Sequence, residues 1–193
     1  MLIIFDEVYK NLRFDGETSS VLKDKDIKEN IVYINSFSKN FGMTGWRVGY
    51  IAADKKLAKE LIKFHQFVSV CGQPFAQHAC AKLLENKKEA KKYTDNVISE
   101  LKKLVAIITE FKSTNDIEMT LPQGGFYSFI KIPKEFSDAE TFCLEILDKE
   151  HISLVPGLAF GDDYKDYYRL SFGSVDQPTL KTALEKIIRY YKN

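Results

Sequence analysis

Three short β-rich runs near the start of the chain constrain its fold more than any other feature. They are Leu2–Phe5, Ile31–Asn35 and Arg47–Ala53. Each run is continuously apolar rather than alternating, which is typical of strands covered on both faces, as in a parallel sheet. The first run opens the chain without a preceding element that could pair with it. We therefore expect a small, poorly covered sheet from which an N-terminal segment is missing.

Helical patterns follow these strands. Asp54 has the character of an N-cap, and apolar residues recur at helical spacing behind it. Pro74 is expected to open a second helix, and a long amphipathic helix is predicted over Glu89–Lys112. Such a helix suits the connection between two lobes. The predicted domains are therefore residues 1–88 and residues 89–193, the latter including the connecting helix.

The second lobe has the pattern of an α+β domain. Strands are predicted at Phe126–Ile132 and Tyr167–Phe172. Ser137, followed three positions later by a glutamate, forms a capping-box signature that predicts a helix over Asp138–Lys149. Asp176 is expected to open the final helix, which continues to the tyrosines near the end of the chain.

Composition argues against several kinds of partner. The 193 residues carry 28 Lys and Arg against 27 Asp and Glu, a formal net charge of +1. No basic excess points to nucleic acid, and no apolar run approaches the roughly 20 residues that cross a bilayer. Cys71, Cys80 and Cys143 lack a CxxC pair, and the histidines lack metal-ligand spacing. We therefore expect no nucleic acid, no membrane, no metal site and a reducing cytoplasm.

The chemistry is concentrated in Ser36–Tyr50, which reads SFSKNFGMTGWRVGY. Lys39 follows a hydroxyl-rich turn and precedes a glycine-punctuated loop, and a lysine held in such a loop suits Schiff-base chemistry. Ser36, Ser38 and Arg47 are the donor types that a phosphate requires, because an arginine can bind it through two N–H groups at once. Taken alone, each arginine of the chain is equally consistent with a surface cation beside a strand.

The whole stretch resembles the cofactor-lysine motif of class I/II aminotransferases, enzymes of the aspartate-aminotransferase type that use pyridoxal 5'-phosphate (PLP). The resemblance implies that Lys39 forms the Schiff base with PLP and, once released by substrate, shuttles the proton during the transfer. It implies that Ser36 and Arg47 bind the cofactor phosphate, with Ser38 as a further hydroxyl contact.

Two flanking motifs resemble the same family. Phe5–Tyr9, which reads FDEVY, is similar to a strand-end motif in which Asp6 pairs with the pyridine nitrogen and Tyr9 bonds the phenolic oxygen. An anion beside the ring nitrogen keeps it protonated, so the ring can accept electrons. Tyr168–Gly173 resembles a small-domain strand of the family whose arginine binds the substrate α-carboxylate. The resemblance implies this role for Arg169.

The resemblance covers essentially the whole chain and implies PLP fold type I. It implies an α/β fold: the C-terminal part of the large PLP-binding domain, with a mostly parallel sheet, followed by a small α+β C-terminal domain. The implied function is that of an amino acid:2-oxo acid aminotransferase that is a homodimer when full length. Several family elements of the cofactor site precede Asp6, so the chain by itself is expected to be an inactive fragment. Phe64, Phe67, Val68 and Val70 are candidate dimer contacts.

Two alternatives share this fold. A PLP-dependent C–S lyase usually departs from the sequence Gly45–Arg47 after the lysine and from Tyr9 in the first motif. A transcriptional regulator with an aminotransferase-like effector domain carries a DNA-binding segment upstream and typically lacks the pair Gly45-Trp46. The sequence does not indicate which amino acid is the substrate.

Overall fold

The computed structural model describes residues 1–14, 20–23 and 28–192. The chain divides into two compact units, unit 1 (Met1–Ile98) and unit 2 (Ser99–Asn193). The division falls inside the long helix α4 (Lys87–Thr114), whereas the sequence places the domain boundary after residue 88, in the first turn of this helix. α4 extends slightly beyond the predicted range at both ends.

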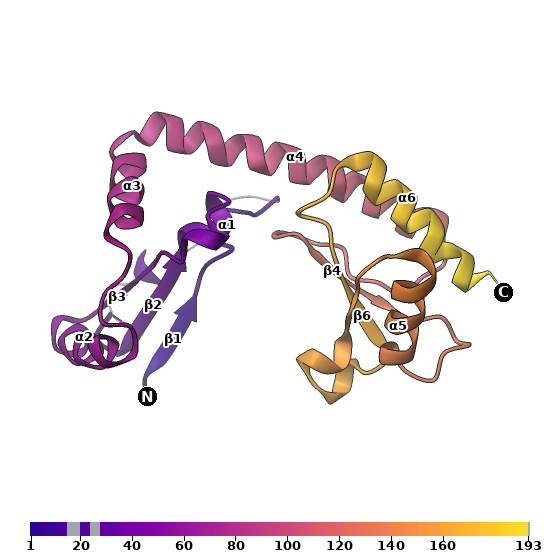
Figure 1. Ribbon diagram of the computed structural model, residues 1–193, viewed down its shortest axis with the longest axis horizontal. Helices are drawn as coiled ribbons and strands as arrows, with labels where there is room; N and C mark the ends of the chain where they lie inside the picture. The colour runs from indigo at the N-terminus through magenta and orange to yellow at the C-terminus, as the bar shows by residue number, and fades with distance from the viewer. Residues whose placement is uncertain (15–19, 24–27, 193) are drawn as a thin grey trace. The chain divides into compact units, whose positions relative to one another are not determined.

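Unit 1 contains a three-stranded sheet (Figure 1). Its strands are β1 (Ile3–Asp6), β2 (Ile31–Ser36) and β3 (Gly49–Ala53), in the order β1-β2-β3. β1 pairs in parallel with β2, and Asp6 lies opposite Ile34. β3 pairs antiparallel with β2, and Gly49 lies opposite Ser36. The loop between β2 and β3 therefore leaves and re-enters the sheet at one end.

The third strand differs from the sequence prediction in direction and in extent. The prediction starts this strand at Arg47 and favours a parallel arrangement, but β3 starts at Gly49 and runs antiparallel. Arg47 has φ 53° and ψ 44°, in the left-handed region, and this conformation cannot continue an extended strand. β3 is also largely exposed rather than covered on both faces, with Ile51 55% exposed.

Helices follow the sheet in unit 1. They are α2 (Lys55–Ser69), α3 (Pro74–Glu85) and the first part of α4. The N-cap prediction for α2 is confirmed, because Asp54 Oδ1 accepts from the N–H groups of Lys56 (2.9 Å) and Leu57 (3.1 Å). Pro74 lies in the first turn of α3, as predicted. The apolar stripe of α2 is only partly covered: Leu57 and Leu61 are half-buried, whereas Val68 is 84% exposed.

Unit 2 combines an antiparallel sheet with helices (Figure 1). The strands are β4 (Tyr127–Lys131), β5 (Val155–Pro156) and β6 (Tyr167–Ser171), in the order β4-β6-β5. The helices after α4 are α5 (Ala139–Glu150) and α6 (Gln177–Ile188). Short 3-10 turns are η4 (Gly157–Phe160), η5 (Asp162–Tyr164) and η6 (Arg189–Tyr191). Its core is fully buried, with Ile108, Ile130, Phe142, Ile146, Tyr168, Phe172 and Ile187 each 0% exposed.

Two helix starts in unit 2 test the capping predictions. Asp176 caps α6 as predicted, since its Oδ1 accepts from the N–H of Thr179 (2.9 Å). The prediction of Ser137 as the cap of α5 is wrong by one residue: Asp138 Oδ1 accepts from the N–H of Thr141 (2.8 Å). The Ser137 hydroxyl instead donates to Asp138 Oδ2 (2.8 Å). A carboxylate has two acceptor oxygens and can serve both donors at once.

Candidate functional site

Asp6 lies at the carboxyl end of β1, where the sheet of unit 1 ends. Its Oδ1 accepts from the N–H of Val8 (3.1 Å), and its Oδ2 has no hydrogen-bond partner among the residues that the structure describes. Because β1 and β2 are parallel, Asp6 and Ser36 lie at the same edge of the sheet. An exposed carboxylate at this edge is in the position where open α/β sheets bind ligands.

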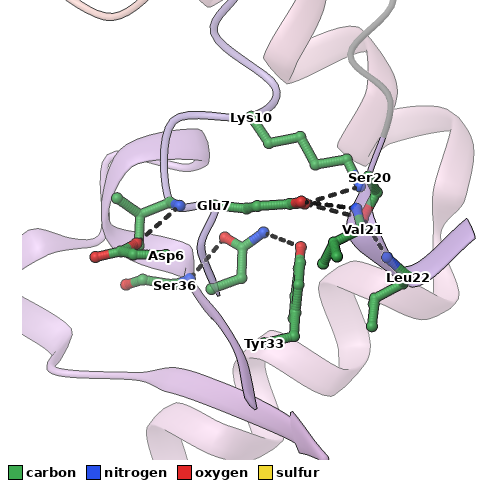
Figure 2. A network of polar contacts seen from close by, with 10 residues as sticks. Asp6, Glu7, Lys10, Ser20, Val21, Leu22, Tyr33 and Ser36 are labelled. Carbon is green, nitrogen blue, oxygen red and sulfur yellow. Dashed lines mark hydrogen bonds and ion pairs between the residues drawn. The ribbon is translucent and has the colours of Figure 1, made fainter. Parts of the chain in front are cut away.

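Glu7, the next residue, anchors the segment behind Asp6 (Figure 2). Its Oε2 accepts from the Ser20 hydroxyl (2.9 Å), its Oε1 accepts from the N–H of Val21 (3.1 Å), and Lys10 Nζ lies 3.4 Å from Oε2. Burial by itself raises the pKa of the Glu7 carboxyl, but these hydrogen bonds and the Lys10 charge together hold the pKa below its ordinary value. The ionised Glu7 carboxylate therefore links the segment after β1 to the segment that contains Ser20 and Val21.

Ser36 connects β2 to the short helix α1 (Phe37–Asn40), which carries Lys39. Its hydroxyl accepts from the N–H of Ser38 (3.0 Å) as the N-cap, and donates to the carbonyl of Val48 (3.1 Å) across the loop. The Ser38 hydroxyl lies 2.9 Å from that of Ser36. The two hydroxyls are thus adjacent at the start of the loop between β2 and β3.

A buried amide supports this turn from behind. Asn35 is 4% exposed, and its Oδ1 accepts from the N–H of Ser36 (2.7 Å). Its Nδ2 donates to the hydroxyl of Tyr33 (2.7 Å). The sequence gives no sign of this role beyond the position of Asn35 directly before Ser36.

The two serines and Arg47 line one groove of about 540 Å³ in unit 1. The other walls come from β2, β3 and α2 and include Tyr50 and His65. Arg47 is exposed and its Nη1 donates to the carbonyl of Thr44 (2.9 Å), in the turn η3 (Thr44–Trp46). Two hydroxyls and a guanidinium form a donor set suited to a phosphate, so these residues fit the phosphate group of PLP.

Lys39 and Tyr9 come together from different segments. Lys39 Nζ lies 5.6 Å from the centroid of the Tyr9 ring, within the range of a cation–π contact. Both residues are half-buried. The amine of Lys39 is therefore held between a turn that follows β1 and the loop that follows β2.

Aromatic contacts hold the loop after Lys39. The ring of Phe41 stacks on Phe37, with centroids 5.8 Å apart, and on Tyr93 of α4, with centroids 6.1 Å apart. Gly42 has φ 63°, and a Cβ at this position would lie 3.0 Å from the Tyr93 hydroxyl. A glycine therefore suits both the conformation and the space at this bend.

Arg169, the predicted substrate residue, lies in β6 of unit 2, opposite Phe129 of β4. It is half-buried, and its Nε is buried without a hydrogen-bond partner. Within the described ranges no carboxylate forms an ion pair with it. A partly buried guanidinium without an anion is costly, so this residue suits an anionic ligand.

Other reactive residues give no sign of a second site. Among the described residues there is no group of three or more His, Cys, Asp and Glu that could hold a metal ion. Burial raises the pKa of the Cys143 thiol to about 12, so this cysteine stays protonated. Within the same residues, no helix is both long and apolar enough to cross a membrane.

Comparison with known proteins gives consistent matches. The family model for aminotransferase class I and II matches residues 1–187. The aspartate aminotransferase of Thermotoga maritima is 35% identical over 188 residues, which cover 96% of this chain and 46% of that protein. The LL-diaminopimelate aminotransferase of Natranaerobius thermophilus is 30% identical over 192 residues, which cover 99% of this chain and 48% of that protein.

Solved structures show the same relation. The crystal structure of an aromatic aminotransferase from Pyrococcus horikoshii superposes with a TM-score of 0.91 at 28% sequence identity. The match covers 100% of this chain and 51% of that structure. The chain thus spans about half the length of the relatives that it matches.

Proposed function

The chain belongs to the family of class I and II aminotransferases and has the fold of type I PLP enzymes; from this premise we propose that the whole protein is a PLP-dependent amino acid:2-oxo acid aminotransferase. One observation carries the proposal. The hydroxyls of Ser36 and Ser38 and the guanidinium of Arg47 line one groove, beside the helix that carries Lys39. The names of the relatives include aspartate, aromatic and LL-diaminopimelate aminotransferases, so the substrate is proposed only as a class.

Six residues of unit 1 would hold the cofactor. Ser36, Ser38 and Arg47 would bind its phosphate, and the Lys39 amine would hold it covalently. The Tyr9 hydroxyl would bond the ring's phenolic oxygen. Asp6, whose Oδ2 has no partner among the described residues, would pair with the ring nitrogen. A carboxylate at that nitrogen keeps it protonated.

The reaction needs a proton acceptor and an anchor for the substrate. Bound at this site, PLP supplies an electron sink for the pair left behind when the substrate loses its Cα proton. Lys39 Nζ would accept that proton, because a primary amine released from the cofactor can act as a general base. Arg169 would bind the α-carboxylate through paired N–H groups, which orients the amino acid for the transfer.

The proposal is tested by chemical trapping. Borohydride reduction of the PLP-loaded protein, followed by peptide mapping, should place the label on Lys39. Lys39→Ala should lose the label and should slow the half-reaction with glutamate by about 10³-fold, because it removes both covalent attachment and proton transfer.

Lys55→Ala is the matched control, since this exposed lysine at the start of α2 should have no part in the chemistry. It should keep both the label and the rate. A label on Lys55, or on any lysine other than Lys39, would disprove the assignment.

We also propose a cytoplasmic homodimer. The residues at the end of α2 and just after it are apolar and strongly exposed: Phe64 is 70% exposed, Phe67 91%, Val68 84% and Val70 78%. Apolar patches of this kind are typical of protein–protein contacts. Cys71, Cys80 and Cys143 are free thiols, which supports a reducing compartment. Sedimentation at micromolar concentration should give a dimer, and a monomer would contradict the proposal.

A further inference from the structure

The guanidinium of Arg169 has aromatic neighbours instead of an acidic one. Its central carbon lies 4.4 Å from the centroid of the Tyr127 ring and 4.8 Å from the centroid of the Phe160 ring. Both distances are within the roughly 6 Å of a cation–π contact. The positive charge is therefore stabilised by two rings, without an ion pair among the described residues.

These two kinds of partner occupy different parts of a guanidinium. An aromatic ring contacts its flat face, whereas a carboxylate binds in its plane through paired N–H groups. Ring contacts therefore do not compete with a carboxylate, as an acidic neighbour would. They restrict the rotation of the side chain without pairing with its in-plane N–H groups.

The rings are themselves held by the fold of unit 2. Tyr127 is the first residue of β4, and its backbone pairs with Ser171 of β6, two residues after Arg169. Phe160 ends the turn η4, and its ring forms a T-shaped pair with that of Phe129, with centroids 5.2 Å apart and an interplanar angle of 77°. Phe129 is the residue opposite Arg169 in the sheet. Both rings are thus positioned by the strands that carry the arginine.

A glycine allows η4 to lie close to the backbone of a later segment of the same unit. A Cβ at Gly157 would lie 2.1 Å from the carbonyl oxygen of Tyr164 and 2.5 Å from that of Tyr167. No side chain fits there, so the turn that carries Phe160 approaches the backbone as closely as a glycine allows. Phe160 is nevertheless 41% exposed, so its ring is not simply a member of the buried core.

We propose that Tyr127 and Phe160 are positioning residues that fix the orientation of Arg169 for a substrate carboxylate. The role rests on the proposed function of Arg169, and extends it to two residues for which the sequence predicts no part in substrate binding. Their rings restrict the guanidinium to one orientation before the substrate binds. The side chain therefore loses less conformational entropy when its N–H groups bind the carboxylate.

Nuclear magnetic resonance of the arginine Nε–H groups of the 193-residue chain tests the proposal. The chain has four arginines, Arg13, Arg47, Arg169 and Arg189, so the spectrum is simple and Arg169→Lys assigns the relevant signal. In Phe160→Leu, the Arg169 signal should move, because a ring current is lost. Its hydrogen exchange should become faster, because the guanidinium loses one of the two rings that restrict its motion.

Pyruvate, a small 2-oxo acid, serves as the carboxylate probe in a titration of the same spectra. Phe160→Leu should weaken its binding about fivefold, the order expected for the loss of one cation–π contact. Phe160→Tyr retains a ring and should restore both the signal and the affinity. Tyr164→Leu is the matched control, because the Tyr164 ring contacts Phe129 and Tyr167 but forms no cation–π contact with Arg169.

The outcomes separate the two proposals. If Arg169→Lys binds pyruvate as well as the unmodified chain, the substrate role of Arg169 is wrong. If Arg169→Lys loses binding but Phe160→Leu leaves the Arg169 signal and the affinity unchanged, the arginine binds the carboxylate and the positioning role is overturned. If Tyr164→Leu has the same effect as Phe160→Leu, the effect belongs to general packing and the positioning role is likewise overturned.

Discussion

Unit 2 buries most of its large apolar side chains, whereas unit 1 leaves many of its own in contact with solvent. Phe142 of α5 is 0% exposed, and its ring packs against Phe136 and Tyr168 with centroids 5.0 and 5.2 Å away. In unit 1, by contrast, Phe67 of α2 is 91% exposed and Ile51 of β3 is 55% exposed. The same residue types thus stabilise the fold in one unit and form accessible surface in the other.

The difference shows what holds each unit in shape. Unit 2 relies on a dry core of aromatic and branched side chains, each worth several kcal/mol when fully buried. The end of the sheet in unit 1 relies on short polar ties: the Glu7 carboxylate, the Asn35 amide and the Ser36 hydroxyl. The predicted cofactor residues lie among these ties, where side chains remain accessible to a ligand.

The largest expected effect comes from truncating a phenylalanine in each unit. Phe142→Ala should lower the free energy of unfolding by about 3–5 kcal/mol, since it leaves a cavity in the core. Phe67→Ala should change it by less than about 0.5 kcal/mol, because the side chain is exposed, but should weaken dimer formation. Urea unfolding followed by circular dichroism measures the first change, and sedimentation measures the second.

The single tryptophan, Trp46, lies in unit 1 and reports that unit separately by fluorescence. Its unfolding transition should be unaffected by Phe142→Ala if the two units unfold independently. An equal loss of folding stability in both phenylalanine variants would remove the contrast between the units.

A pair of glycines should show a smaller difference. Gly157→Ala in unit 2 should destabilise the protein by about 1–3 kcal/mol, because the new Cβ would overlap two carbonyl oxygens. Gly45→Ala in unit 1 has nothing within 4 Å of the new Cβ, and should be neutral or stabilising by up to about 1 kcal/mol. Thermal unfolding of both variants measures the difference. A Gly157→Ala protein as stable as Gly45→Ala would show that η4 can move away at no cost.

The smallest effect should be a pH dependence confined to unit 1. The pKa of Glu7 is lowered by folding, so its stabilisation is present above the unfolded pKa and is lost as pH falls through the folded value. Glu7→Gln should therefore lose less stability on acidification from about pH 6 to about pH 3 than the unmodified protein does. Trp46 fluorescence during urea unfolding at each pH provides the measurement.

Glu60→Gln is the control for this prediction, because Glu60 lies exposed on α2 and its one ion pair among the described residues is with the nearby Lys63. It should keep the pH profile of the unmodified protein. If Glu7→Gln keeps that profile as well, the carboxylate is not the group that ties the two segments together.

Local signals predicted most helix starts, because a cap depends on a few neighbouring residues. Asp54 and Asp176 each accept backbone N–H groups as expected, and Pro74 opens its helix. The cap of α5 was misplaced because Ser137 and Asp138 are both good capping residues, and only the observed hydrogen bonds distinguish them.

Features that depend on distant partners were not predictable in the same way. The left-handed conformation of Arg47 follows from the return of the loop to β2, which no local pattern indicates. β5 is two residues long, too short for an apolar pattern, and is held by pairing with Arg169 and Tyr168. The contact between Phe160 and Arg169 likewise requires knowledge of which strands are adjacent.

The roles of the site residues remain predictions, since they came from a motif rather than from geometry. The structure adds their arrangement. Ser36, Ser38 and Arg47 line one groove, and Lys39 lies near Tyr9. Asp6 is at the same edge of the sheet, and Arg169 belongs to unit 2.

The antiparallel pairing of β2 with β3 has a consequence for the order in which the site assembles during folding. Ser36 and Gly49 are close in the chain and face each other, so closing this loop has a small entropic cost. Asp6 must find Ile34 across a much longer stretch of chain, and such long-range pairings form more slowly. We therefore expect the loop that carries Lys39 and the proposed phosphate-binding residues to form early in folding. The pairing of β1 with β2, which places the Asp6 carboxylate beside this loop, should form later.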